Sequence, residues 1–561
     1  MTFPAWSIAP FVLMLAAIAI APLVPALAHR WERPRNQLLY ALALGLPVAI
    51  GVIAAGQGLL VTHAVVEYLQ FIILLLTLFV VSGGIFLRGD IAATPRTNTI
   101  FLAVGGVLAS FIGTTGAAML LVRPLLNTNS ERKHVAHTIV FTIFVVANCG
   151  GLLTPLGDPP LFLGMLRGVP FEWTFTLWPE WLFVNAMLLI TYYALDRRLV
   201  AREAPEDVEI DRTNIVPLRL VGIPSVLCFV AVILTVAFVP SVDATILAHG
   251  HAHGMELVPW RELLMLAIAA VSYVIGDKRI RFEENAFEWA PILEVAALFV
   301  GIFLTMIPAL EVLRNLAPRL PLNEITLFIF TGGLSSVLDN APTYATFFEM
   351  ASQMPGAPRV AGVPETMLVS ISLGAVFCGA LTYIGNGPNF MVKSVAESHG
   401  VIMPSFGGYV SRALFNLAPN LLAMLLLFIA QPWWAKALGA VLTVAMLIRA
   451  VVLARSGHHT APYEHERAGI RAAAHGPEPD GPKHTGAIRV VDPGDDVPGG
   501  LADDGLADER PGAEGPAPAA AHAAQAGTPS DDALPAASTT ASENHHTADL
   551  DPGSGVPERT A

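Results

Sequence analysis

Two aspartates lie where hydrocarbon is expected. Asp158 and Asp339 both occur inside strongly apolar stretches, and a proline follows each of them within three residues. An ionisable group in a membrane-spanning segment is costly, so it usually serves a function. A low dielectric favours the protonated form of a carboxyl group, whereas a bound cation favours the ionised form. One aspartate can therefore exchange a proton for Na⁺, which is the chemical basis of cation/proton antiport.

Each acidic residue also has a structural interpretation. Asp158 could cap the short helix that follows it, and Asp339 could pair with a buried arginine. Glu67 and Glu294 could belong to a proton pathway, since both lie near the start of an apolar run. For these two glutamates we favour the alternative, in which the helix dipole satisfies an interfacial carboxylate.

Oxygen-bearing residues occur beside the two aspartates and in the related hairpin and broken segments. Hard cations prefer oxygen ligands, which hydroxyls, amides and the free carbonyls of a broken helix can supply. We expect no cofactor and no resident metal, only Na⁺ or Li⁺ as transported ion. The predicted ion- or substrate-binding residues are Thr114, Thr115, Asn148, Thr154, Gly157, Asp158, Ser335, Ser336, Asp339, Asn340, Thr382, Gly385, Asn386 and Asn389.

The segment 148–160 cannot form a continuous helix. Pro155 removes a backbone donor, and the Pro159–Pro160 pair disfavours helical backbone before it. Residues 382–388 repeat the pattern of 154–160 at an offset of 228. Broken backbone at membrane depth is tolerated only where protein buries it or where it lines a cavity.

The composition is that of a membrane protein. Of 561 residues, 54% are hydrophobic and only 14% charged, with a mean hydropathy of +0.59. The net charge of −13 arises mainly in the tail 456–561, which we expect to be disordered. The histidines cluster in loops and in this tail. Three of them (His249, His251 and His253) indicate an external linker rather than a metal site. Nothing indicates nucleic-acid binding.

The sequence predicts an all-α polytopic membrane protein with about 10–13 crossings. Several apolar runs are short or interrupted, which favours half-helices and re-entrant hairpins. The predicted spans are 5–28, 38–56, 65–87, 99–126, 135–153, 161–167, 179–196, 217–239, 261–276, 290–310, 323–338, 342–353, 366–383, 389–398, 408–430 and 433–454.

The placement of arginine predicts the orientation. Arg-rich loops such as 29–35 and 278–281 alternate with the loops 57–64 and 240–260, which contain no Lys or Arg. By the positive-inside rule the N-terminus lies outside a bacterial-type inner membrane and the C-terminal tail lies in the cytoplasm. The span 261–276 then runs opposite to its counterpart 38–56.

Four landmarks recur in order at offsets of 224 to 228, which indicates two inverted repeats. Paired broken helices in inverted repeats are typical of secondary transporters. The expected domains are 1–35 (first helix and loop), 36–240 (first repeat), 241–260 (external loop), 261–430 (second repeat), 431–455 (extra helix) and 456–561 (tail).

Three motifs resemble the ion transporter superfamily, in its citrate transporter-like or NhaD-type sodium:proton antiporter branch. They are residues 150–160, 338–344 and 383–393, and the resemblance covers about 10–430. It implies two inverted repeats, each with a re-entrant hairpin and a broken helix, often in a homodimer. The first hairpin departs from the family: Gly113-Thr-Thr-Gly-Ala117 lacks the acidic pair that many NhaD-type hairpins carry.

The charge of the two aspartates favours some transported substrates over others. A carboxylate substrate beside two aspartates would be repelled unless cations accompanied it. We therefore expect a sodium(lithium)/proton antiporter that works by alternating access. Its expected partners are a small inorganic cation, a proton and the lipid bilayer, and we expect a homodimer. The alternatives are a cation-coupled citrate or dicarboxylate transporter and a non-transporting membrane sensor or scaffold. The chain has no phosphate-binding loop and no set of nucleophile and base, so we do not expect an enzyme.

Overall fold

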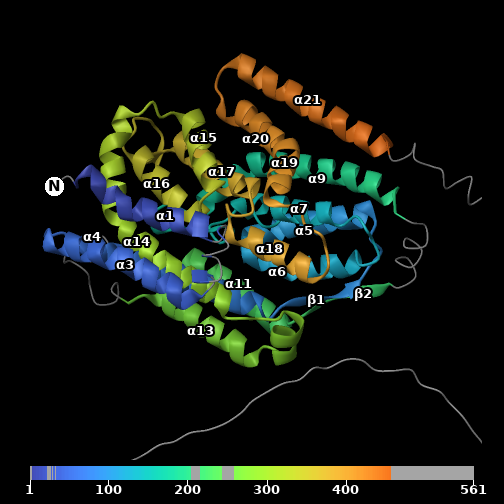
Figure 1. The fold of residues 1–561 in the computed structure, drawn as a ribbon, viewed down its shortest axis with the longest axis horizontal. Helices are drawn as coiled ribbons and strands as arrows, with labels where there is room; N and C mark the ends of the chain where they lie inside the picture. Colours follow the sequence, from blue (N-terminus) through green and yellow to red (C-terminus); the bar gives the residue numbers. More distant parts are fainter. Residues whose placement is uncertain are drawn as a thin grey trace, which may run out of the picture. The chain divides into compact units, whose positions relative to one another are not determined.

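The computed structural model describes residues 3–21, 24, 27, 30–31, 33–203, 215–242 and 258–456 (Figure 1). Nearly all of the described elements are helices, which confirms the predicted all-α membrane class. Most of the external loop 241–260 and nearly all of the tail 456–561, with their histidines, lie outside the described residues. The predicted domain boundaries stay predictions.

Six described helical segments are long and apolar enough to cross a membrane, by length and composition. Five shorter apolar helices accompany them. The six are Pro34–Ala54, Gly58–Ser82, Pro95–Ile112, Ala290–Arg319, Phe406–Ile429 and Trp433–Ser456.

The first half of the chain contains one hairpin and one broken helix. Its elements are η1 (Ala5–Ile8), α1 (Ala9–Ile20), α3 (Pro34–Ala54), α4 (Gly58–Ser82), β1 (Phe86–Asp90), α5 (Pro95–Ile112), α6 (Thr114–Thr128), α7 (Ala136–Val145), η3 (Cys149–Leu152), α8 (Pro159–Leu166), η4 (Phe171–Leu177) and α9 (Trp178–Val200).

The second half also contains one hairpin and one broken helix. Its elements are β2 (Val216–Val221), α11 (Ile223–Phe238), α13 (Trp260–Ile275), η5 (Arg279–Glu284), α14 (Ala290–Leu316), η6 (Ala317–Arg319), α15 (Glu324–Ser335), α16 (Asn340–Ser352), β3 (Arg359–Val360), β4 (Val363–Pro364), α17 (Glu365–Cys378), η7 (Gly379–Leu381), α18 (Gly387–Ser398), α19 (Phe406–Asn416), α20 (Ala418–Met424), η8 (Leu425–Ile429) and α21 (Trp433–Ser456).

The packing between the halves is reciprocal. Helix α3 packs on α14, and its counterpart α13 packs on α4. Likewise α6 packs on α18, and α16 packs on α8. A two-fold relation between two repeats produces this exchange of partners, so the packing supports the inverted repeat.

Three predicted spans differ clearly from the structure. The run 65–87 leaves helix α4 after Ser82 and enters strand β1 at Phe86. The run 99–126 is two helices, α5 and α6, because Gly113 between them has a φ of +81°, which turns the chain at the tip of the hairpin. The run 217–239 begins as strand β2, which pairs antiparallel with β1, before α11 starts. The apolar residues of β1 do not alternate. In β2, Val216, Leu218 and Leu220 alternate with Pro217 and Arg219, but this short pattern leads directly into the apolar run of α11, so the sequence predicts a single span.

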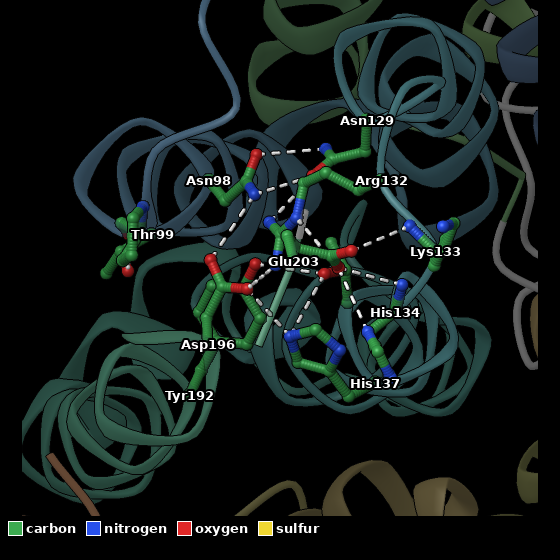
Figure 2. Close-up of polar contacts among 12 residues, drawn as sticks. Asn98, Thr99, Asn129, Arg132, Lys133, His134, His137, Tyr192, Asp196 and Glu203 are labelled. Atoms are coloured by element: carbon green, nitrogen blue, oxygen red, sulfur yellow. Dashed lines mark hydrogen bonds and ion pairs between the residues drawn. The ribbon is translucent and has the colours of Figure 1, made fainter. Parts of the chain in front are cut away.

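A buried polar cluster links the hairpin of α5 and α6 to α7 and α9 at the end away from the hairpin tip (Figure 2). We call it the Asp196 cluster. Asp196 of α9 accepts hydrogen bonds from Arg132 (2.6 Å) and Asn98 (3.4 Å), and it contacts Nε2 of His137 at 2.8 Å. His137 is buried within α7, so the expectation that the histidines lie in loops and the tail is wrong for this residue. The cluster comprises the buried Asn98, Asn129, Arg132, His137, Asp196 and Glu203, with the exposed His134 at its edge.

We expect Asp196→Asn to lower the free energy of unfolding by about 3 kcal/mol, because it removes the nearer counter-charge of the buried Arg132 guanidinium and leaves it the more distant Glu203 carboxylate, at 3.8 Å. The apparent melting temperature of the purified protein would measure the effect. Arg279→Gln is the control, since its ion pair with Glu283 is exposed and should contribute little. Equal melting of both variants would contradict an anchoring role for the cluster.

Candidate functional site

The two broken helices are held open by equivalent threonines. The hydroxyl of Thr154 donates to the carbonyl of Ser110 at the end of α5. The hydroxyl of Thr382 donates to the carbonyl of Ser336, just after α15, at 2.5 Å. Each threonine also accepts a backbone N–H from its own break, Leu156 or Gly385, at 3.2 Å. Both predicted threonines therefore shape the breaks by fastening them to a hairpin tip.

Glycines allow the chain to fold back on itself at each break. A β-carbon at Gly157 would lie 2.7 Å from the carbonyl carbon of Gly151, and one at Gly385 would lie 2.7 Å from the carbonyl oxygen of Ser335. Both approaches are closer than β-carbon contacts normally are. Only glycine fits at positions 157 and 385, because a β-carbon there would overlap the neighbouring backbone.

Asp158 is the point at which the two halves of the chain meet. Its side chain is buried, with 1% of the residue exposed. It accepts hydrogen bonds from Thr114 of α6 (3.0 Å), Asn340 of α16 (2.5 Å) and Asn386 (3.3 Å). Although Asp158 precedes α8, its side chain makes no capping hydrogen bond there. The capping interpretation is therefore wrong for this side chain.

Asp339 has the capping role instead. Its Oδ1 accepts the backbone N–H of Ala341 at 3.0 Å, which caps α16. Among the described residues no arginine or lysine pairs with it, so the alternative interpretation, an ion pair with a buried arginine, is wrong. The side chain is half-buried and faces the same cleft as Asp158.

An amide network lies behind Asp158. Asn148 donates to Oδ1 of Asn389 at 2.6 Å and accepts from Asn386 at 3.2 Å. Asn389 donates to the carbonyls of Gly379 and Thr382 at 2.9 Å. These three asparagines connect the two breaks directly, and through Asn386 they reach the carboxylate of Asp158.

Four helices begin at one cleft. Its volume is about 130 Å³, and it lies between the pair α4 and α14 and the broken elements. Helices α6, α8, α16 and α18 begin at Thr114, Pro159, Asn340 and Gly387. Each helix start carries roughly half a positive elementary charge, so two ionised aspartates about balance the four. The predicted site residues that line the cleft are Thr114, Thr115, Gly157, Asp158, Asp339 and Asn386.

The other predicted residues lie outside the cleft. Ser335 is buried and donates to the carbonyl of Ala375 at 2.7 Å, and Ser336 donates within its own helix end. Glu294 is half-buried in the second turn of α14, near the helix start as expected.

Glu67 differs from expectation. It lies well inside α4, which starts at Gly58, so a helix start cannot satisfy it. Its carboxylate is buried and contacts Arg167 at 3.4 Å. Arg167 also donates to the carbonyl of Ala345 at 3.1 Å and lies over the ring of Phe348. The sequence marks both residues as charges near apolar runs. It does not predict that they pair, because they are 100 positions apart and only the fold brings them together.

We expect Arg167→Gln to lower the free energy of unfolding by about 3 kcal/mol, since Glu67 would stay buried without its partner. Adding Glu67→Gln should recover part of the loss, and thermal melting of the single and double variants would measure it. Additive effects would show that the two side chains are not coupled.

Gly157→Ala should lower the free energy of unfolding by about 1–3 kcal/mol, because the added β-carbon overlaps the backbone of Gly151. Gly333→Ala is the matched control: nothing lies within 4 Å of its added β-carbon. Comparable melting of both variants would contradict the close approach at the first break.

Comparison with known proteins gives the family. Residues 1–429 match the model of a family described as "putative citrate transport". An uncharacterized transporter of Mycobacterium tuberculosis (strain H37Rv) is 24% identical over 392 residues, which are 65% of this chain and 87% of the relative. A 46 kDa membrane protein of Mycobacterium leprae is 24% identical over 315 residues, 54% of this chain and 68% of the relative. The chain belongs to this citrate transport family and is a multi-pass membrane transporter, not an enzyme.

Proposed function

We propose that the protein is a secondary active transporter in which Asp158 holds a cation and a proton in turn, as a sodium(lithium)/proton antiporter does. The observation that carries this proposal is the buried contact of Asp158 with both halves of the chain. A change of charge on this carboxylate acts on a hydrogen-bond donor in each repeat. Coupling between an ion and a conformational change needs such a shared group.

A side-chain oxygen without a hydrogen-bond partner, next to Asp158, favours the binding of a cation there. Within the described part of the chain, Oδ1 of Asn340 is buried and has no hydrogen-bond donor. A buried acceptor without a partner is destabilising. A cation between this oxygen and the Asp158 carboxylate would satisfy it with the hard oxygen ligands that Na⁺ and Li⁺ prefer.

The charge of the cleft favours a cation over a free polyanion. None of the described residues that line it is Lys, Arg or His, while two are aspartates. When both aspartates are ionised they about balance the four helix starts, so a tricarboxylate would need accompanying cations.

The route to the site supports an inward-facing state. The cleft adjoins a second cavity, with which it shares Ser82, Thr115 and Met391. This cavity reaches Arg123 and residues 285–288, next to the Arg-rich turn that the sequence assigns to the cytoplasm. Alternating access would close this route and open the end near Arg167.

A second candidate is cation-coupled citrate or dicarboxylate transport. The family description favours it, and four helix starts would bind carboxylate groups. The sensor or scaffold alternative is not favoured, because the family and the relatives described as transporters indicate transport.

Transport by the purified protein in proteoliposomes tests the proposal. With an imposed pH gradient, Na⁺ or Li⁺ should release protons across the membrane, while K⁺ and citrate should not. Asp158→Asn should abolish the response, because the amide cannot take up a proton. Glu283→Gln, which neutralises an exposed side chain, is the control and should respond like the unmodified protein. A response to citrate without one to Na⁺ or Li⁺ would replace antiport by the second candidate.

A further inference from the structure

The two ends of the cleft are packed differently, although the reciprocal packing of the repeats makes them equivalent. At one end α6 packs on α18, and a cavity of about 400 Å³ lies between these helices, the end of α4 and the start of α14. At the other end α8 packs on α16, while α8 also packs on α4 and α16 on α14. We call these the α6–α18 end and the α8–α16 end. Alternating access between two equivalent ends produces this kind of asymmetry, with one end open and the other closed.

A buried ion pair lies at the α8–α16 end. Glu67 of α4 and Arg167, the residue after α8, are 3.4 Å apart, with 8% and 11% of their side chains exposed. Arg167 also donates to the carbonyl of Ala345 in α16 at 3.1 Å and lies over the ring of Phe348. Its guanidinium therefore joins α8 to α16 and, through Glu67, joins both helices to α4.

A second ion pair at the same end is more exposed. Arg314 of α14 contacts Glu349 of α16 at 3.3 Å, and 47% and 24% of these side chains are exposed. Ion pairs that water reaches contribute little to stability. The buried pair of Glu67 and Arg167 is therefore the stronger of the two charged contacts that hold α8 and α16 to their neighbours.

Helix α8 connects this ion pair to the site at Asp158. Asp158 precedes the first residue of α8, and Arg167 follows the last. The helix has eight residues and is therefore about 12 Å long. Phe162, in the middle of the helix, is buried and lines the cleft. Because a short helix moves as one rigid element, a displacement at Asp158 is transmitted to Arg167.

We propose that the Glu67–Arg167 ion pair is the gate of the α8–α16 end. It holds this end closed while the α6–α18 end is open, and it breaks when α8 and α16 move away from α4. The proposal rests on the alternating access of the proposed function and names the contact that stabilises one of its two states. In the open state water reaches both charges, which offsets the lost contact and lets the pair break and re-form.

The labelling rate of an introduced cysteine measures the opening of this end. Ala345 is buried and lies one turn from Phe348 on the same side of α16, so N-ethylmaleimide should reach Ala345→Cys only when the gate opens. The full-length protein in nanodiscs exposes both membrane faces to the reagent. We expect Glu67→Gln to raise this labelling rate roughly five-fold or more, because the amide has no charge to hold Arg167. Glu283→Gln, which neutralises an exposed pair, should leave the rate unchanged.

Two native cysteines separate gating from unfolding. Cys149 begins η3 and Cys378 ends α17, and both are buried. Movement of α8 and α16 away from α4 leaves them covered, whereas unfolding exposes them. Mass spectrometry of the labelled peptides should therefore find both unlabelled in Glu67→Gln. If that variant does not fold, Glu67→Asp replaces it: its carboxylate is one methylene shorter and should raise the labelling of Ala345→Cys in the same direction.

An unchanged labelling rate of Ala345→Cys in a folded variant of Glu67 would overturn the proposal. So would an equal rise at Cys149 and Cys378, since the ion pair would then only hold the fold together. Sodium/proton exchange with an unchanged labelling rate would overturn the gate alone. The expected labelling in a protein that exchanges neither Na⁺ nor Li⁺ for protons would support the gate and remove antiport.

Discussion

The buried carboxylate of Asp158 is the constraint on which the rest of the site depends. An ionised carboxylate away from water requires donors or a cation around it. Here the donors come from α6, α16 and the second break, which are far apart in the sequence. The hairpin tips and the breaks must therefore lie together around Asp158. The glycines, threonines and asparagines near them hold them in this position.

Small residues make this convergence possible. The breaks turn back on themselves only because glycine occupies positions 157 and 385, and they keep their shape because a threonine ties each one to a hairpin. The amide network of Asn148, Asn386 and Asn389 then joins one break to the other. The site is built almost wholly from short polar side chains and backbone, which leaves little freedom of position within it.

Much of this arrangement could be predicted from the sequence. Proline and glycine interrupt apolar runs at 148–160 and 379–388, and local rules of that kind predict broken helices without tertiary information. The aspartates could be recognised because a charge in an apolar run is unusual. Their roles as partner and cap could not be told apart, since the partners of Asp158 lie in other segments of the chain. The Asp196 cluster and the pair of Glu67 and Arg167 were missed for the same reason: each needs contacts between elements that no local pattern contains.

The exchange of partners between the halves has a consequence for the protein as a whole. Because α3 lies against α14 and α13 against α4, the apolar face of each half is covered by the other. One core cluster contains buried residues of both halves. A substitution that alters the shape of one repeat therefore also affects the packing of the other, even though the two repeats differ in chemistry at Asp158 and Asn386.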